Sequence, residues 1–150
     1  MKRILYNIIM AAAVLFLAAG CQKESERVKE MLVGDWHYSG TEQGVAEDVW
    51  LCFSADGTFD MYQKLGDGVH WHSTGRYTID VDKKVISGSY SDKTPWRYDY
   101  KYSLSGSSLV MKAVQLESYS VSYSKGTVPS EVLEKALELT KASAGFVPFL

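Results

Sequence analysis

The stretch "MLVGDWHYSG", from Met31 to Gly40, is the part of the chain that decides the fold. Gly34 stands two residues before Trp36, at the head of a run in which apolar and polar residues alternate. A period of two is typical of a β-strand with one buried face and one wet face. The stretch therefore predicts the first strand of a β domain and raises the question of why a glycine and a tryptophan begin it.

The same period continues as far as Lys125, with turn signals roughly every ten residues, and this is typical of an all-β meander. Asp56 and Gly57 predict a hairpin, because glycine accepts a positive φ. Pro95 lies in a longer connection, since it cannot donate to a ladder. We expect eight strands near Gly34–Gly40, Asp48–Ser54, Thr58–Lys64, Trp71–Val81, Val85–Tyr90, Arg97–Leu104, Ser108–Gln115 and Ser118–Lys125.

Alternate residues divide each predicted strand into two faces. In the second strand, Val49, Leu51 and Phe53 share the apolar face, whereas Trp50 and Cys52 lie on the other. Eight such strands joined by short hairpins close most simply into an antiparallel up-and-down barrel, because closure leaves no strand edge exposed. The interior of a barrel of this size holds packed side chains or one small ligand.

The period changes in "TVPSEVLEKALELTKASAG", over 127–145, and predicts a C-terminal α-helix. Pro129 suits the first helical turn, Glu131 suits the positive end of the helix dipole, and Gly145 suits the end of the helix. Its apolar stripe is formed by Val132, Leu133, Ala136, Leu137 and Thr140. We expect the stripe to pack against the barrel wall, the alternatives being a partner or the membrane. The apolar tail "FVPFL" should also be covered.

Residues 1–20 have the pattern of an export signal, with basic Lys2 and Arg3 before an apolar run that is short for a bilayer span. "LAAGC", which ends at Cys21, resembles a bacterial lipobox, and this implies that Cys21 becomes the first mature residue and carries acyl chains such as palmitate. Gln22 then implies sorting to the outer membrane of a Gram-negative cell. We predict a signal peptide over 1–20, a lipidated, flexible tether over 21–30, and the barrel with its helix over 31–150.

The charge balance restricts the partners of the mature chain. Removing Lys2 and Arg3 from the 16 basic residues leaves 14 against 18 acidic ones, a net charge of −4 with His neutral. This mildly acidic balance argues against nucleic acid as a partner. Lipidation of Cys21 would leave Cys52 without a disulfide partner, so the stability of the fold must come from its core.

Gly34 and Trp36, at the start of a predicted eight-stranded barrel, resemble the Gly-x-Trp signature of the lipocalins and their calycin relatives. The chain is similar to the lipocalin-like domains of small Gram-negative lipoproteins in "LVGDW", "VWLCFSADGTFDMYQ", "GRYTID", "ISGSYSDKTPW", "YSLSGSSLVM" and "VPSEV". The resemblance implies that Gly34 permits a close approach, that Trp36 closes one end of the barrel, and that the barrel binds a ligand. Lys125 stands where many lipocalins place an arginine over this tryptophan.

Tyrosines are the main candidates for a binding site. Six tyrosines share the inward parity, namely Tyr77, Tyr98, Tyr100, Tyr102, Tyr119 and Tyr123. Tyr90 is placed with them. An unpaired buried hydroxyl costs roughly 1–3 kcal/mol, which favours a partly wet interior or a polar, aromatic ligand over a fatty acid. Alternatively, the rings fill the core and their hydroxyls reach solvent or one another. The predicted ligand-binding residues are Trp71, Tyr77, Tyr98, Tyr100, Tyr102 and Tyr119, with Trp96 near the same mouth.

Two further groups of residues are candidates for a metal site and for a reactive thiol. His70 and His72 share one face of a strand at a spacing that suits a metal, with Asp67 or His37 as a third ligand; outward-facing rim histidines are the favoured alternative. Cys52 has no base at a recognisable spacing and is expected to be a structural thiol outside the barrel, under the C-terminal helix. No catalytic motif and no cofactor fingerprint stands out.

Three functions are compatible with these features. The leading hypothesis is a non-enzymatic, lipid-anchored barrel of the outer membrane that captures a small amphipathic or aromatic molecule. The second is an interaction module with a filled barrel that docks another envelope protein, through its wall or through Leu133 and Leu137 of the helix. The third is a metal-dependent enzyme built on His70 and His72.

Overall fold

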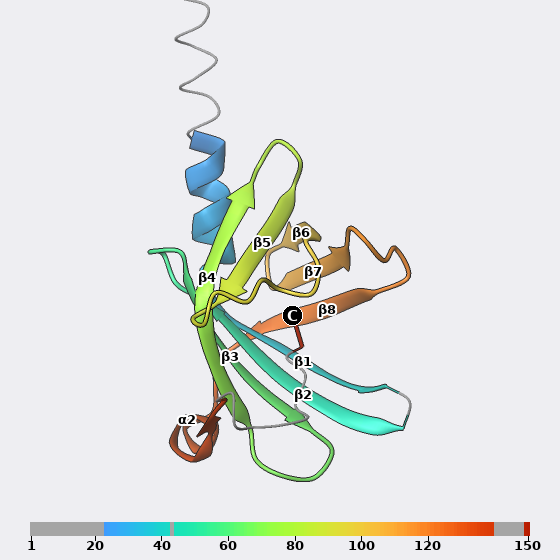
Figure 1. Cartoon of the computed structure of the whole chain (residues 1–150). Helices are drawn as coiled ribbons and strands as arrows, with labels where there is room; N and C mark the ends of the chain where they lie inside the picture. The colour runs from blue at the N-terminus through green and yellow to red at the C-terminus, as the bar shows by residue number, and fades with distance from the viewer. Residues whose placement is uncertain (1–22, 43, 140–148) are drawn as a thin grey trace, which may run out of the picture.

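The computed structural model describes residues 23–42, 44–139 and 149–150. A helix over 23–32 stands at one end of a set of strands that curve around a single interior (Figure 1). The elements that follow are β1 (Gly34–Glu42), β2 (Val45–Phe53), β3 (Thr58–Leu65), β4 (Trp71–Asp80), β5 (Val85–Tyr90), β6 (Tyr100–Ser105), β7 (Ser108–Ala113), β8 (Ser120–Gly126), α2 (Ser130–Lys135) and β9 (Leu137–Glu138). The eight predicted strands are confirmed, although several begin or end at other residues.

Strands β1–β8 form a closed antiparallel barrel, as the alternating pattern predicted. Each strand pairs with its neighbour along the chain, and β1 also pairs with β8, with Trp36 opposite Lys125. The ladder between β5 and β6 is short, since its register pairs are Val85 with Lys101 and Ile86 with Tyr100. Closure satisfies the backbone hydrogen bonds that edge strands would leave exposed.

Trp96 fills the wall beside this short ladder. Its backbone N–H donates to the Gly88 carbonyl at 2.9 Å, and its ring lies directly over Gly88. A Cβ atom at Gly88 would stand 2.3 Å from Cε2 of Trp96, so only glycine permits this approach. The ring of Phe59 meets that of Trp96 edge-on at 5.1 Å, which ties the connection between β5 and β6 to the core.

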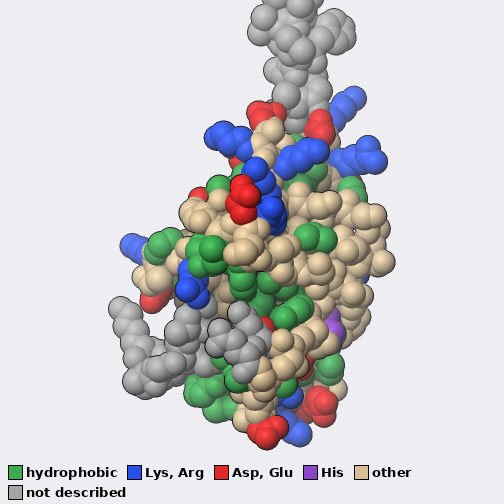
Figure 2. All heavy atoms as spheres, turned by 90° about the vertical axis from the view of Figure 1, so that its right-hand side faces the viewer, with side chains coloured by type: hydrophobic (Ala, Val, Ile, Leu, Met, Phe, Trp, Pro, Cys, Tyr) green, Lys and Arg blue, Asp and Glu red, His purple; other side chains and the backbone are tan. Residues whose placement is uncertain are grey.

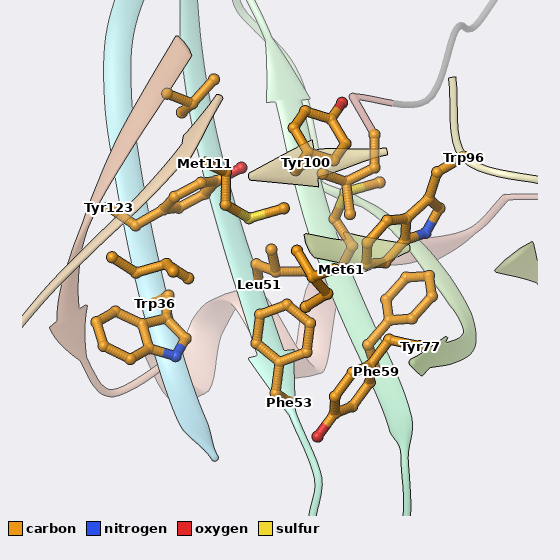
Figure 3. Packing of buried hydrophobic residues seen from close by; sticks show 14 of the residues in the cluster. Trp36, Leu51, Phe53, Phe59, Met61, Tyr77, Trp96, Tyr100, Met111 and Tyr123 are labelled. Carbon is orange, nitrogen blue, oxygen red and sulfur yellow. The ribbon is translucent and has the colours of Figure 1, made fainter. Parts of the chain in front are cut away.

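The core occupies the barrel interior and follows the parity of the strands. Figure 3 shows inward side chains from β1, β2, β3, β4, β6, β7 and β8 meeting one another, together with Trp96. Among its buried members are Trp36, Val49, Leu51, Phe53, Phe59, Met61, Tyr77, Ile86, Tyr100, Leu109, Met111, Val121 and Tyr123. Burial of these apolar side chains is the main favourable contribution to folding, because the described part of the chain contains no disulfide.

The glycine and the tryptophan of the opening stretch close one end of the barrel. The indole N–H of Trp36 donates to the carbonyl of Leu32 at 2.7 Å, and Nζ of Lys125 lies 5.3 Å from the centroid of the Trp36 ring. Gly34 has a φ of 125°, and a Cβ atom there would stand 3.2 Å from Cε of Lys125. Gly34 is therefore required by its backbone conformation, and its lack of a side chain leaves room for Lys125, which makes a cation–π contact with Trp36.

The C-terminal helix predicted from the sequence forms only in its first part, as α2. α2 ends at Lys135, Ala136 is extended with a ψ of 137°, and β9 then pairs in parallel with the start of β4. The N–H groups of Leu137 and Leu139 donate to the carbonyls of His70 and His72, at 2.9 and 2.8 Å. β5 covers only the second half of β4, so the first half offers free backbone partners that outweigh helical propensity. Residues 140–148, with the expected helix end, lie outside the described residues.

The prediction that the whole apolar stripe of that helix packs against the barrel wall is wrong. Val132 packs on Trp50 and Val128 outside the barrel, with Cys52 against them. Leu133 and Leu137 are instead 52% and 50% exposed, because the chain becomes extended after α2 and the stripe never lines up on one face.

The helix over 23–32 replaces the flexible tether that the charged sequence suggested. The N–H of Val33 donates to the Lys29 carbonyl at 2.9 Å, and Leu32 is buried in the barrel core. Packing of Leu32 beside Trp36 holds the end of the helix, a contact that charge composition alone does not reveal. Cys21 lies outside the described residues. Among the described residues, no helix has the length and apolar character needed to span a bilayer.

Candidate functional site

Aromatic rings line the barrel interior toward the end away from Trp36. Tyr98 packs edge-on against Tyr100 at 6.2 Å and lies 5.8 Å from Tyr119, while Tyr38 lies 6.1 Å from Tyr123. We call these five residues the interior tyrosine cluster. β8 begins just after Tyr119 and ends beside Trp36, which places the cluster away from the closed end. The rings are offset or edge-on, the geometry that aromatic pairs favour.

Several polar atoms in this interior have no protein partner. Tyr100 and Tyr123 are each 1% exposed, and neither hydroxyl has a hydrogen-bond partner in the described part of the chain; the same holds for Nε1 of Trp96. Burial raises the pKa of both tyrosines, and neighbouring tyrosines add to the effect, so their hydroxyls stay protonated at neutral pH. The interior therefore holds hydrogen-bond donors for which the described protein supplies no acceptor.

The interior is mostly apolar, and its buried polar side chains are uncharged. The buried polar side chains of the described residues are Gln63 and Ser73, and no charged side chain is buried with them. Figure 2, which faces the right-hand side of Figure 1, shows most Lys and Arg side chains around the N-terminal helix and hydrophobic side chains in the middle of the face. Because a buried charge without a partner is strongly disfavoured, the interior suits a neutral molecule that carries an acceptor such as a carbonyl.

The structure brings together only some of the predicted ligand-binding residues. Tyr98, Tyr100 and Tyr119 belong to the interior tyrosine cluster, whereas Tyr77 packs on Phe53 at 4.8 Å and donates its hydroxyl to the Ser54 carbonyl at 2.8 Å. Parity places a side chain inside the barrel but does not give its height along the axis, and Tyr77 lies near the hairpin at Gly57.

Tyr102 and Trp71 also stand apart from the cluster. Tyr102 packs against the core cluster, and burial raises the pKa of its hydroxyl, to which the carboxylates of Glu24 and Asp80 add. Trp71 is half-buried at the start of β4 and is not a member of the core cluster.

Three interior residues were missed as site residues. Tyr38 has the parity of Trp36, and Gln63 has that of Phe59 and Met61, so both could have been placed inside from the pattern. Phe149 gave no such signal, because "FVPFL" shows only that a tail is apolar. Phe149 packs against the core and Leu150 is buried in it, so these two residues of the tail are covered as expected.

The three histidines lie outside the barrel, as parity predicted for His70 and His72, and each is bonded to a carboxylate. Nε2 of His37 and Nε2 of His70 lie 2.6 and 3.0 Å from the two oxygens of Asp48. His72 lies 2.8 Å from Asp60 and 2.7 Å from Glu138 of β9. In the described part of the chain, no three His, Cys, Asp or Glu side chains are arranged to hold a metal ion. His37 does approach His70, but His72 has separate partners, so the geometry does not favour the metal hypothesis.

These contacts shift the protonation of the outer groups. Burial lowers the pKa of His72, but the hydrogen bonds that its ring donates to Glu138 and Asp60 outweigh burial and hold the pKa above its ordinary value. Burial alone would raise the pKa of Asp48, but its bonds with His37 and His70 hold it below. The His72 ring also stacks on Tyr62 at 4.5 Å. The contacts of His72 with Asp60 and Glu138 therefore join β9 to β3 and β4 on the outer face of the barrel.

Cys52 lies on the outer face near Val132, as predicted. Burial and the nearby carboxylate of Asp35 raise the pKa of its thiol, so the nucleophilic thiolate is scarce at neutral pH. These properties are those of a structural thiol.

The comparisons with known proteins support the fold alone. No family model matches the sequence, and no curated protein matches it. The chain is similar to the NMR structure of a protein from Bacteroides uniformis ATCC 8492, with a TM-score of 0.53, 21% identity, and coverage of 65% of this chain and 90% of that one. Likeness at this identity supports the fold and carries no function.

Proposed function

We propose that this protein is a lipid-anchored, non-enzymatic, lipocalin-like protein of the outer membrane that binds a small, uncharged, amphipathic or aromatic molecule inside its barrel. One observation carries the binding proposal: the hydroxyls of Tyr100 and Tyr123 are buried as donors without acceptors in the described part of the chain. A ligand with a carbonyl among these rings would remove that penalty and gain aromatic contacts. The arrangement of Gly34, Trp36 and Lys125 supports the lipocalin-like assignment.

Titration with Prodan, an uncharged naphthalene that carries a carbonyl and reports polarity by its emission, tests the binding. We expect saturable, one-site binding to the full mature chain. Replacing both Tyr100 and Tyr123 with Phe should weaken binding by roughly 5- to 150-fold, if each lost hydrogen bond contributes about 0.5–1.5 kcal/mol, and shift the bound emission to the blue.

Tyr77→Phe is the matched control for this experiment, since the Tyr77 hydroxyl is already bonded to Ser54 outside the cluster. It should leave the affinity for Prodan unchanged. Absence of saturable binding, together with native mass spectra free of any co-purified molecule, would contradict the proposal.

The membrane anchor rests on the sequence "LAAGC" and is tested separately. Cells that express the full chain should incorporate labelled palmitate into it and place it in the outer-membrane fraction. A Cys21→Ser variant should incorporate no label and leave that fraction, whereas Cys52→Ser should behave as the native protein. Equal labelling of the Cys21→Ser variant would exclude Cys21 as the lipidated residue.

The exposed Leu133 and Leu137 favour one second candidate, an interaction module that docks an envelope protein through α2 and β9. It predicts specific capture of such a protein from envelope extracts and loss of capture when both leucines are replaced with Ala. Undiminished capture of the same protein by that variant would argue against docking through this surface.

A further inference from the structure

Two residues far along the chain lie inside the barrel, at the site where a ligand is proposed. Leu150 is 2% exposed and belongs to the core cluster, and Phe149 packs against the same cluster. In Figure 1 this end of the chain lies at β8 and close to β1, whose Tyr38 contacts Phe149. The interior of the unliganded protein is therefore partly occupied by its own chain.

The main chain of this segment is recognised by two side chains from different strands. The N–H of Phe149 donates to Oε1 of Gln63 at 2.8 Å, and the hydroxyl of Tyr90 donates to the carbonyl of Leu150 at 2.9 Å. Gln63 is a polar side chain of β3 that is only 1% exposed. Both contacts are made to backbone groups, so the barrel binds the main chain of the segment and does not merely cover two apolar side chains.

The side chain of Phe149 stands among the proposed ligand-binding rings. Its centroid lies 5.5 Å from that of Tyr38 and 6.5 Å from that of Tyr119. Both tyrosines belong to the interior tyrosine cluster, so an aromatic ligand stacked there would need the position of this ring. The Phe149 ring and such a ligand are mutually exclusive occupants.

Fewer main-chain hydrogen bonds hold Phe149 and Leu150 than hold a strand of the barrel. Phe149 and Leu150 lie in no strand, and the hydrogen bonds described for their main chain come from Gln63 and Tyr90. Releasing them breaks no ladder and leaves β1–β8 closed, so departure is a local opening and not global unfolding.

We propose that Phe149 and Leu150 are a displaceable internal occupant of the ligand site, and that an external ligand binds by replacing them. This inference rests on the proposed function of the barrel interior. Gln63 and Tyr90 set the chemistry of exchange, since each offers to the incoming molecule the hydrogen bond that the peptide gives up. A ligand that carries a carbonyl and an aromatic ring reproduces the contacts of the Leu150 carbonyl and the Phe149 ring.

Occupancy by the segment lowers the apparent affinity for any external ligand by the fraction of molecules that are open. If the segment is in place in all but roughly one to ten per cent of molecules, releasing it tightens binding by about 10- to 100-fold. The test is Prodan titration of the full mature chain and of its Phe149→Ala/Leu150→Ala variant. Leu133→Ala, which removes an exposed leucine, is the matched control and should bind as the native chain does.

A peptide with the sequence "FVPFL", added to the double variant, should compete with Prodan and restore the weaker apparent binding. If the native chain and the double variant bind Prodan equally, the internal occupant is excluded, while the proposed binding function stands. If neither binds, the proposed function fails, and the displacement proposal fails with it, because no ligand replaces the segment.

A measurement on the native chain keeps the proposal testable should the double variant fold poorly. The amide proton of Phe149, which is bonded to Gln63, should exchange with solvent at least roughly 10-fold faster when Prodan saturates the protein. Saturable binding with an unchanged exchange rate at Phe149 would overturn the displacement mechanism.

Discussion

The unpaired hydroxyl of Tyr123 leads to an unusual expectation, namely that removing it stabilises the unliganded protein. The hydroxyl is buried and has no partner in the described part of the chain. A buried donor without an acceptor costs about 1–3 kcal/mol relative to its hydrated state in the unfolded chain. Phe keeps the ring and loses only the dispersion contacts of one oxygen, a few tenths of a kcal/mol. We expect Tyr123→Phe to raise the free energy of unfolding by about 1 kcal/mol.

Tyr77→Phe is the internal comparison, because this hydroxyl is buried in the same core but donates to the Ser54 carbonyl at 2.8 Å. Its removal leaves that carbonyl short of a partner and should lower the free energy of unfolding by about 0.5–1.5 kcal/mol. The same atom is deleted from the same residue type at both positions. The two variants should therefore differ by about 2 kcal/mol, with opposite signs relative to the native chain.

Urea unfolding followed by tryptophan fluorescence measures the difference, provided that the slopes with urea agree among the three proteins. A Tyr123→Phe variant that is about 1 kcal/mol less stable than the native chain would refute the reasoning, because the hydroxyl would then already be bonded in the unliganded protein. The single observation on which the proposed function rests would be lost with it.

Three further predictions concern the closed end and the outer face. Trp36→Ala should lower the free energy of unfolding by about 3–5 kcal/mol in urea titrations, since it empties the closed end and removes the bond to Leu32; a loss below about 1 kcal/mol would contradict that role. The pKa of His72 is raised in the folded protein, so the stabilisation by its charged ring is complete below the unfolded pKa of about 6.5 and is lost as the pH rises through the folded pKa. The difference in free energy of unfolding between the native and His72→Gln chains should therefore shrink over that pH range. A constant difference would show that the contacts of His72 with Asp60 and Glu138 do not stabilise the fold through its charge. In a Cys21→Ser chain, Cys52 should react with a thiol reagent at about pH 8 far more slowly when folded than when unfolded; equal rates would show an accessible thiolate.

The faces of the strands were readable from the sequence, and so was much of the core. Leu51, Phe53, Phe59 and Met61 are buried as their alternation predicted, and Cys52 lies outside under α2. A period of two determines which residues share a face whatever the strand pairs with. The candidate site was only partly readable, because parity placed Tyr77 among the inward tyrosines but gave no information on its height in the barrel.

The corrections concern contacts that join distant parts of the chain. The helical pattern after Pro129 was genuine, but α2 ends early because the free half of β4 accepts β9. The charged residues after Cys21 suggested a tether, yet Leu32 fixes the end of a helix against Trp36. In both cases a tertiary contact overrode a local preference, whose strength is a fraction of a kcal/mol per residue.

By itself the sequence determined that this chain forms an antiparallel β-barrel, because alternation and turn residues act over a few neighbours and are written in order along the chain; the place of Trp36 at one end was implied by the resemblance to lipocalins. Only the tertiary structure decided which tyrosines meet, which carboxylate each histidine takes, and that Phe149 enters the interior. Those outcomes depend on pairs such as Gln63 and Phe149, which lie 86 residues apart in the sequence and meet only when the barrel closes.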